Sequence, residues 1–180
     1  MTRLIHLNGP PGIGKSTLAA RYAEEHPHVL NCDIDTLRSM IGGWRHDFVA
    51  AGDLIRPAAL AMIGAYLRTG NDVVLPQLLL QPEEIATFEE CATRAGAQFV
   101  ERILMDTAAR SVTRFHQRGT SDPRDAVIKE FVHLQGGEVF LVSVHAALEQ
   151  LAHEREGALV IPSVEGDVRG THDLLVTSLG

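Results

Sequence analysis

The chain has 180 residues, of which 45% are hydrophobic and 22% are charged, and its formal net charge is −7. This length and composition are typical of one globular domain with a substantial core, and they exclude a disordered chain. The acidic balance disfavours a broad nucleic-acid-binding surface, which normally needs a basic face.

Targeting and redox signals are weak in this sequence. We find no signal-peptide pattern and no apolar run that approaches the length of a membrane span, so we expect no contact with a membrane. Cys32 and Cys91 have neither C-x-x-C spacing nor a disulfide-rich setting. We therefore expect two reduced, buried thiols and a cytoplasmic location. The sequence leaves the oligomeric state open.

The first element is an apolar strand over residues 3–8, and a glycine-rich turn follows it directly. Residues 9–17 fit the P-loop pattern G-x-x-x-x-G-K-[ST] in full. Glycines at three positions permit the positive φ values with which backbone N–H groups surround an anion. In such a loop the lysine reaches the β- and γ-phosphates, and the following serine ligates Mg²⁺. The predicted nucleotide-binding residues are Gly9, Gly12, Ile13, Gly14, Lys15, Ser16 and Thr17.

The pattern predicts ATP with Mg²⁺ as the ligand of this loop. The alternative is a glycine-rich turn between a strand and a helix that binds nothing. Such a turn would not need Lys15 and Ser16 at these two offsets, nor the apolar strand ahead of them.

The rest of the chain alternates between helices and short apolar strands. Residues 47–68 have helical spacing, with Pro57 as a point at which the stretch divides into two helices. The predicted order is helix 15–26, strand 28–32, helix 36–41, helical stretch 47–68, strand 72–77, helix from Pro82, strand 98–105, helical insertion 107–154, strand 158–161 and helix 167–179. We expect one α/β P-loop NTPase domain over residues 1–180. Its mainly parallel five-stranded sheet is flanked by helices, and the nucleotide lies at the carboxyl edge.

A pair of carboxylates follows the second strand. Transfer of a phosphoryl group to a hydroxyl needs a carboxylate that accepts the proton, and this strand end faces the γ-phosphate region. We predict Asp35 as that base and Asp33 as a group that assists Mg²⁺ through water. Arg38 lies three residues beyond Asp35, on the same helix face, where it holds an anionic or polar part of the acceptor. Helix capping stays open as an alternative role for either aspartate.

An arginine stripe occupies the helical insertion. Arg110, Arg114 and Arg118 are four residues apart, so they line one face of a helix. Arginine binds phosphates bidentately and stacks on planar bases, which suits a lid over ATP. We place this lid at residues 114–124, with a flexible tip at 119–123. The alternative for Arg110 and Arg124 is a solvated basic face paired with nearby aspartates.

These motifs resemble P-loop kinases. The most similar branch contains the kinase domain of polynucleotide kinase, chloramphenicol phosphotransferase and the zeta-toxin-like and AAA-type small kinases. The resemblance rests on the P-loop at 9–17, the Asp35-x-x-Arg38 pair and the turn at 118–120. It implies that Asp35 activates the acceptor hydroxyl, that Arg114 lies near the adenine and that Arg118 lies near the transferred phosphoryl. It also implies that residues 165–167 form the adenine loop.

One departure from that family pattern concerns the third strand. Related kinases end this strand in an aspartate followed by Thr-Asn, whereas this chain has Gln77 and then Leu79 at the corresponding positions. A carboxylate near Mg²⁺ is therefore missing, and Asp33 is a possible replacement. Gln77 then belongs to the acceptor pocket, and the leucines that follow it, at 78–80, make this pocket more apolar. The alternative is that these leucines only form part of the hydrophobic core.

We therefore expect an ATP-dependent kinase for a hydroxyl of a small molecule, such as an antibiotic, a nucleoside or a sugar-like compound, with Lys15 and Arg118 neutralising charge. A polynucleotide 5′-hydroxyl kinase is the first alternative, although the acidic charge and the change at Gln77 disfavour it. A regulatory nucleotide-binding module without an acceptor is the second, and the missing carboxylate favours that reading.

Overall fold

A computed structural model describes residues 1–119 and 122–180. The strands are β1 (Arg3–Asn8), β2 (Leu30–Asn31), β3 (Val73–Pro76), β4 (Gln98–Met105) and β5 (Ala158–Pro162). The helices are α1 (Lys15–Glu25), α2 (Ile34–Arg38), α3 (Phe48–Leu67), α4 (Pro82–Arg94), α5 (Ala108–Gln117), α6 (Pro123–Leu134), α7 (Glu138–Glu154) and α8 (Val168–Leu179). The predicted fold class, an α/β fold with a five-stranded sheet flanked by helices, is confirmed.

The five strands form one sheet in the order β2-β3-β1-β4-β5, and every neighbouring pair is parallel. β1 is the central strand, with β3 on one side and β4 on the other. All five strands therefore end at the same edge of the sheet, and the loops that follow β1, β2 and β3 lie together there. Ligands bind at this carboxyl edge in parallel α/β sheets.

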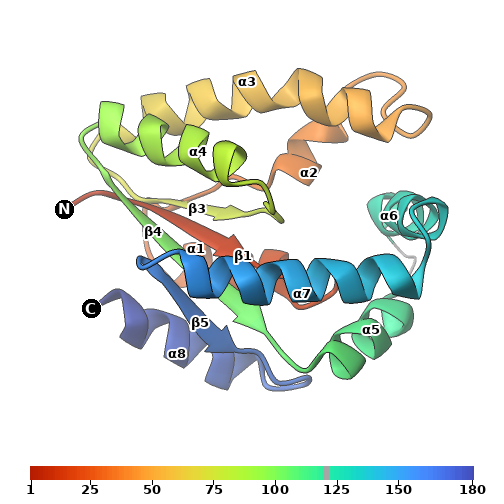
Figure 1. The fold of residues 1–180 in the computed structure, drawn as a ribbon. Helices are drawn as coiled ribbons and strands as arrows, with labels where there is room; N and C mark the ends of the chain where they lie inside the picture. Colours follow the sequence, from red (N-terminus) through yellow and green to blue (C-terminus); the bar gives the residue numbers. More distant parts are fainter. Residues whose placement is uncertain (120–121) are drawn as a thin grey trace.

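Helices cover both faces of the sheet (Figure 1), and an apolar cluster lies on each face. On one face, Ile5 and Leu7 of β1 pack against α1 and α8. On the other face, Leu4 packs with residues of α3, α4 and α7. Because side chains alternate along a strand, successive residues of β1 supply both clusters.

Helix α3 corrects two predictions. It is one helix of 20 residues with Pro57 inside it, and not two helices. Its length and mean hydropathy of 1.4 also make it long and apolar enough to cross a membrane by composition alone, contrary to our expectation for the chain. Ala59, Ile63 and Leu67 are buried in the core beside the sheet, so one face of this helix belongs to the interior of the domain.

Other boundaries differ less. The second strand is only Leu30–Asn31, and the short helix after it begins at Ile34 because Asp33 caps it. The insertion 107–154 consists of the three helices α5, α6 and α7. Thr120 and Ser121, in the tip of the predicted lid, lie outside the described residues.

A charged network is buried within the α3–α4–α7 face of the sheet. Glu101 of β4 is 2% exposed and accepts a 2.6 Å hydrogen bond from Nε of Arg155. His6 of β1 is fully buried, and its Nδ1 lies 3.3 Å from Oε1 of Glu101. Burial alone raises the pKa of Glu101, but the contacts of this carboxylate with His6 and Arg155 hold that pKa below its usual value. The network therefore keeps a carboxylate ionised inside the core.

Candidate active site

The P-loop connects β1 to α1 at the carboxyl edge of the sheet. Gly9, Gly12 and Gly14 all have positive φ values, of 144°, 82° and 106°. A Cβ atom at Gly9 would lie 2.6 Å from the carbonyl oxygen of Leu104, and one at Gly12 would lie 3.0 Å from Cα of Phe115. The loop thus passes between β4 and α5 at a separation that only glycine permits.

The N-terminus of α1 opens toward the same space. Gly14 is its N-cap residue, and no described side chain forms a capping hydrogen bond there. The first turn of α1 also contains no acidic residue. The backbone N–H groups and the positive end of the helix dipole are therefore available to an anion, as phosphate sites at helix N-termini require.

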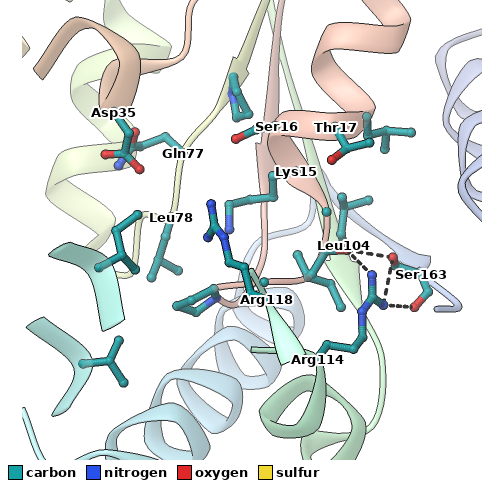
Figure 2. A pocket seen from close by; sticks show the side chains of 18 of the residues that line it. Lys15, Ser16, Thr17, Asp35, Gln77, Leu78, Leu104, Arg114, Arg118 and Ser163 are labelled. Carbon is teal, nitrogen blue, oxygen red and sulfur yellow. Dashed lines mark hydrogen bonds between the residues drawn. The ribbon is translucent and has the colours of Figure 1, made fainter. Parts of the chain in front are cut away.

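Lys15 lies at the centre of the site (Figure 2). Its Nζ donates hydrogen bonds to the carbonyl oxygens of Gly9 at 2.7 Å and Pro10 at 3.0 Å. Burial lowers the pKa of Lys15 to about 8, with Asp35 opposing this shift and Arg118 adding to it. A phosphate group beside Nζ would favour the charged amine and raise this pKa again.

The two aspartates after β2 have different environments. Oδ1 of Asp33 accepts hydrogen bonds from the backbone N–H groups of Asp35 at 2.9 Å and Thr36 at 3.2 Å, so Asp33 caps α2. Asp35 lines the pocket that contains the P-loop and pairs with Nη1 of Arg38 at 2.8 Å. Burial raises the pKa of Asp35, while Arg38 and Lys15 act in the opposite direction. The capping alternative thus describes Asp33, and Asp35 remains the candidate base.

Arg38 is held on several sides. Its guanidinium carbon lies 3.9 Å from the centre of the Phe48 ring, a cation–π contact. A Cβ atom at Gly52 of α3 would lie 2.8 Å from Nη2 of Arg38. The arginine side chain is consequently buried between Asp35, an aromatic ring and the backbone of α3.

Of the three arginines in the predicted stripe, Arg110 and Arg114 share one face of α5, where each lies 3.7 Å from Asp106, whereas Arg118 follows the end of the helix. Arg114 of α5 donates to the carbonyl oxygens of Ile13 and Ser163, each at 2.7 Å. Arg110 is exposed and lies 3.7 Å from Asp106, as the alternative reading expected. α5 ends at Gln117, so Arg118 leaves the helix direction and extends toward Lys15 (Figure 2).

Arg118 also pairs with Asp125 of α6, so its guanidinium is shared between α6 and the site. Arg124, at the start of α6, pairs with Asp122 at 2.6 Å and donates a hydrogen bond to the Thr36 hydroxyl of α2. The alternative of a solvated basic face therefore describes Arg124 only in part, because this arginine also connects α6 to α2, the helix that carries Asp35.

Gln77 follows β3 and lines the pocket. Its backbone carbonyl lies 2.9 Å from Nε2 of the buried His6, so this imidazole nitrogen is the donor. Its side-chain Oε1 is buried without a hydrogen-bond partner among the described residues. A buried carbonyl oxygen that lacks a partner normally finds one in water or a ligand. The sequence prediction that Gln77 belongs to the acceptor side is consistent with this position.

These residues surround one cavity of about 630 Å³, within the usual range for small-molecule sites. The P-loop lies between its two ends. One end is formed by Arg114 and the segment from Ser163 to Gly166, which includes part of the predicted adenine loop. The other end lies between α2, α3 and α6. Its lining includes Ile128, Phe131 and Phe140. We did not predict these residues as part of the site from the sequence, although their spacing is typical of the apolar face of a helix.

Mg²⁺ fits the donors that this cavity offers. The exposed Ser16 side chain and the Asp35 carboxylate both line it, and Mg²⁺ prefers oxygen ligands. Within the described residues there is no cluster of three acidic, histidine or cysteine side chains suited to a metal. The ion would therefore take most of its ligands from nucleotide phosphates and water, as Mg²⁺ usually does.

A model of the AAA domain family matches residues 4–136 of this sequence. The chain belongs to this family. Its matched region includes the P-loop, Asp35, Gln77 and the arginines of α5. No curated protein matches the sequence significantly.

Three solved structures resemble this AAA domain over nearly the full length of both chains. They are a deoxyadenosine kinase from M. mycoides (14% identity, TM-score 0.55, covering 99% of this chain and 98% of that one), a tunicamycin resistance protein from Deinococcus radiodurans (13%, 0.61, 100% and 96%) and a gluconokinase from Sinorhizobium meliloti (17%, 0.57, 98% and 94%). At such identities the likeness concerns the fold. The predicted resemblance to small P-loop kinases is thus confirmed for the fold of this AAA domain.

Proposed function

We propose that the protein is a kinase that transfers the γ-phosphoryl group of ATP to a hydroxyl of a small molecule. The observation that carries this proposal is that Lys15, Ser16, Asp35 and Arg118, from three separate segments, line one cavity. Positioning and charge stabilisation supply most of the catalysis in phosphoryl transfer, and these side chains suit both tasks. The fold shared with two small-molecule kinases and one antibiotic resistance protein agrees with it.

The roles follow from the chemistry of each group. The P-loop N–H groups and Lys15 would bind the β- and γ-phosphates, and Arg118 would reach the transferred phosphoryl group. Ser16 would hold Mg²⁺, which neutralises phosphate charge when bound. Asp35 would accept the proton of the acceptor hydroxyl as its oxygen forms a bond to the γ-phosphorus. The bond from that phosphorus to the bridging oxygen breaks, and ADP leaves.

Two proposals concern the finer assignments. The raised pKa of Asp35 suits a general base better than an ordinary aspartate, because proton transfer is most efficient when the pKa approaches the working pH. Asp33 already accepts two backbone hydrogen bonds, so we assign it to positioning Asp35 first and to water near Mg²⁺ second. The role of residues 114–124 as a lid, the cytoplasmic location and the single domain over 1–180 also remain proposals.

The experiment that tests this function is transfer of labelled γ-phosphate from ATP to a panel of small alcohols and to a 5′-hydroxyl oligonucleotide. We expect transfer to a small alcohol that is lost in Asp35→Asn, while ATP affinity changes little. Transfer to the oligonucleotide alone would support the polynucleotide kinase instead. ATP binding without transfer to any acceptor would support a regulatory module.

A further inference from the structure

The end of the cavity remote from the adenine loop has an aromatic wall. We call this end the acceptor chamber, and its apolar lining consists of Phe48, Val49, Leu78, Ile128, Phe131 and Phe140. The ring centres of Phe48 and Phe131 are 5.4 Å apart, and those of Phe131 and Phe140 are 6.1 Å apart. All three rings are only half-buried, so part of their surface faces the cavity. Such a wall packs well on a flat ring.

The cations of the acceptor chamber are already neutralised. Arg38 pairs with Asp35, Arg56 with Glu84 and Arg118 with Asp125. Lys15 and the N-terminus of α1 would bind the phosphates of the nucleotide under the proposed function. No described cation in this chamber is therefore left for an anionic group on the acceptor. An acidic acceptor would have to break one of these pairs, which leaves a half-buried carboxylate without its partner.

Arg38 is the residue that would otherwise bind such an anion. Its position between Asp35, the ring of Phe48 and Gly52 leaves little freedom to turn toward a ligand. It is only 7% exposed. Arg38 is therefore better suited to orient Asp35 than to bind an acidic part of the acceptor. Binding of an anionic part of the acceptor was one of the two roles that we expected for Arg38 from the sequence.

We propose that the acceptor is an uncharged alcohol that carries an aromatic ring, and that this ring packs on the Phe48–Phe131–Phe140 wall. This inference rests on the proposed kinase function in one respect, because only a kinase would make the bound alcohol a phosphoryl acceptor. The binding preference itself does not depend on that function. It selects among the acceptor classes that the sequence left open. A nucleoside-like or other aromatic alcohol fits, whereas an acidic sugar, a nucleotide or a nucleic-acid end does not.

The test measures binding without chemistry. The protein is saturated with Mg²⁺ and a non-hydrolysable ATP analogue, and its affinity is measured for alcohols in matched classes: neutral aromatic, neutral ring-free, anionic aromatic and anionic ring-free. Thymidine against thymidine 3′-monophosphate and glucose against gluconate are two such pairs. We expect the tightest ligands in the neutral aromatic class. Tightest binding by an anionic or a ring-free class, or no binding by any aromatic alcohol, would overturn the proposal.

Two variants examine the wall and the charge separately. Phe131→Leu keeps an apolar side chain but removes the ring, and we expect affinity for the neutral aromatic ligands to fall about tenfold, the value of one aromatic contact. Val49→Lys adds a cation at a 58% exposed position of the chamber. We expect it to improve binding of the anionic member of each pair by about two- to fivefold, the strength of an exposed ion pair.

Leu54→Lys provides the matched control. Leu54 is 69% exposed on the same helix and does not line the cavity, so this substitution adds the same charge without placing it in the chamber. Equal effects of both lysine variants would contradict the charge argument. If aromatic alcohols bind but no phosphoryl transfer occurs, the kinase proposal fails and the chamber proposal stands. If phosphoryl transfer occurs only to anionic or ring-free acceptors, the kinase proposal stands and the chamber proposal fails.

Discussion

The contact between Gly52 and Arg38 gives a prediction that separates stability from activity. Glycine in the middle of a helix is about 0.5–1 kcal/mol less stable than alanine, so Gly52→Ala in an ordinary helix would stabilise the protein. Here the new Cβ would lie 2.8 Å from Nη2 and 3.2 Å from Cζ of Arg38, so the guanidinium must move. The substitution therefore disturbs the residue that orients the candidate base.

The expected magnitudes follow from the contacts that are lost. Displacing Arg38 weakens its pair with Asp35, worth about 1 kcal/mol because that aspartate is 32% exposed. It also weakens the cation–π contact with Phe48, worth about 1 kcal/mol. These losses outweigh the helix gain, and we expect a free energy of unfolding about 1 kcal/mol below that of the wild type. Misplacement of Asp35 should slow phosphoryl transfer at least tenfold.

Gly64→Ala is the control for this experiment. Gly64 belongs to the same helix, and a Cβ there would lie 3.3 Å from Sγ of Cys91, far from the cavity lining. Urea unfolding and labelled-ATP transfer are measured for both variants. Removal of Arg38 from Asp35 should also raise the pKa of this base and shift the acidic limb of the pH–rate profile upward. Gly52→Ala with wild-type transfer and a free energy of unfolding no lower than that of the wild type would refute the positioning role.

Two further predictions concern groups whose pKa is shifted. Lys15 has a pKa of about 8 that phosphate should raise, so ATP binding at pH 8 should take up protons. Calorimetry in buffers of different ionisation enthalpy measures this uptake, and its persistence in Lys15→Met would contradict the assignment. Glu101→Gln should lower the free energy of unfolding at pH 7 by about 2 kcal/mol, because Arg155 loses a hydrogen bond to a buried carboxylate and keeps only Glu89 as a charged partner. Since the folded pKa of Glu101 is lowered, this contribution is present above its unfolded pKa and is lost as the pH falls through the folded value. Equal urea stability of both proteins at pH 7 would show that the network contributes nothing.

The sequence predicted those parts of the site that local geometry determines. β1 and the P-loop are adjacent in the chain, and the glycine pattern has few other uses, so their positions were predictable. The same holds for Asp35, because the carboxyl ends of parallel strands meet at one edge.

Contacts between distant elements were not predictable in this way. α3 continues through Pro57 and packs one face in the core, which the local pattern around Pro57 does not reveal. Arg118 departs from the predicted stripe because α5 ends one residue before it. The approach of Arg38 to Gly52 depends on how α2 meets α3, and the aromatic wall depends on how α6 lies over the cavity. These relations arise only once the helices are packed.

The lowered pKa of Lys15 also gives the protein an unusual chemical reactivity. The chain has only two lysines, Lys15 and Lys129. At pH 8 about half of Lys15 is a neutral amine, whereas an ordinary lysine has less than about 1% in this form. Acylating reagents should therefore modify Lys15 ahead of Lys129, and ATP should protect it. The mass of the peptide that contains Lys15 would then show whether ATP occupies the P-loop, and this measurement does not require a known acceptor.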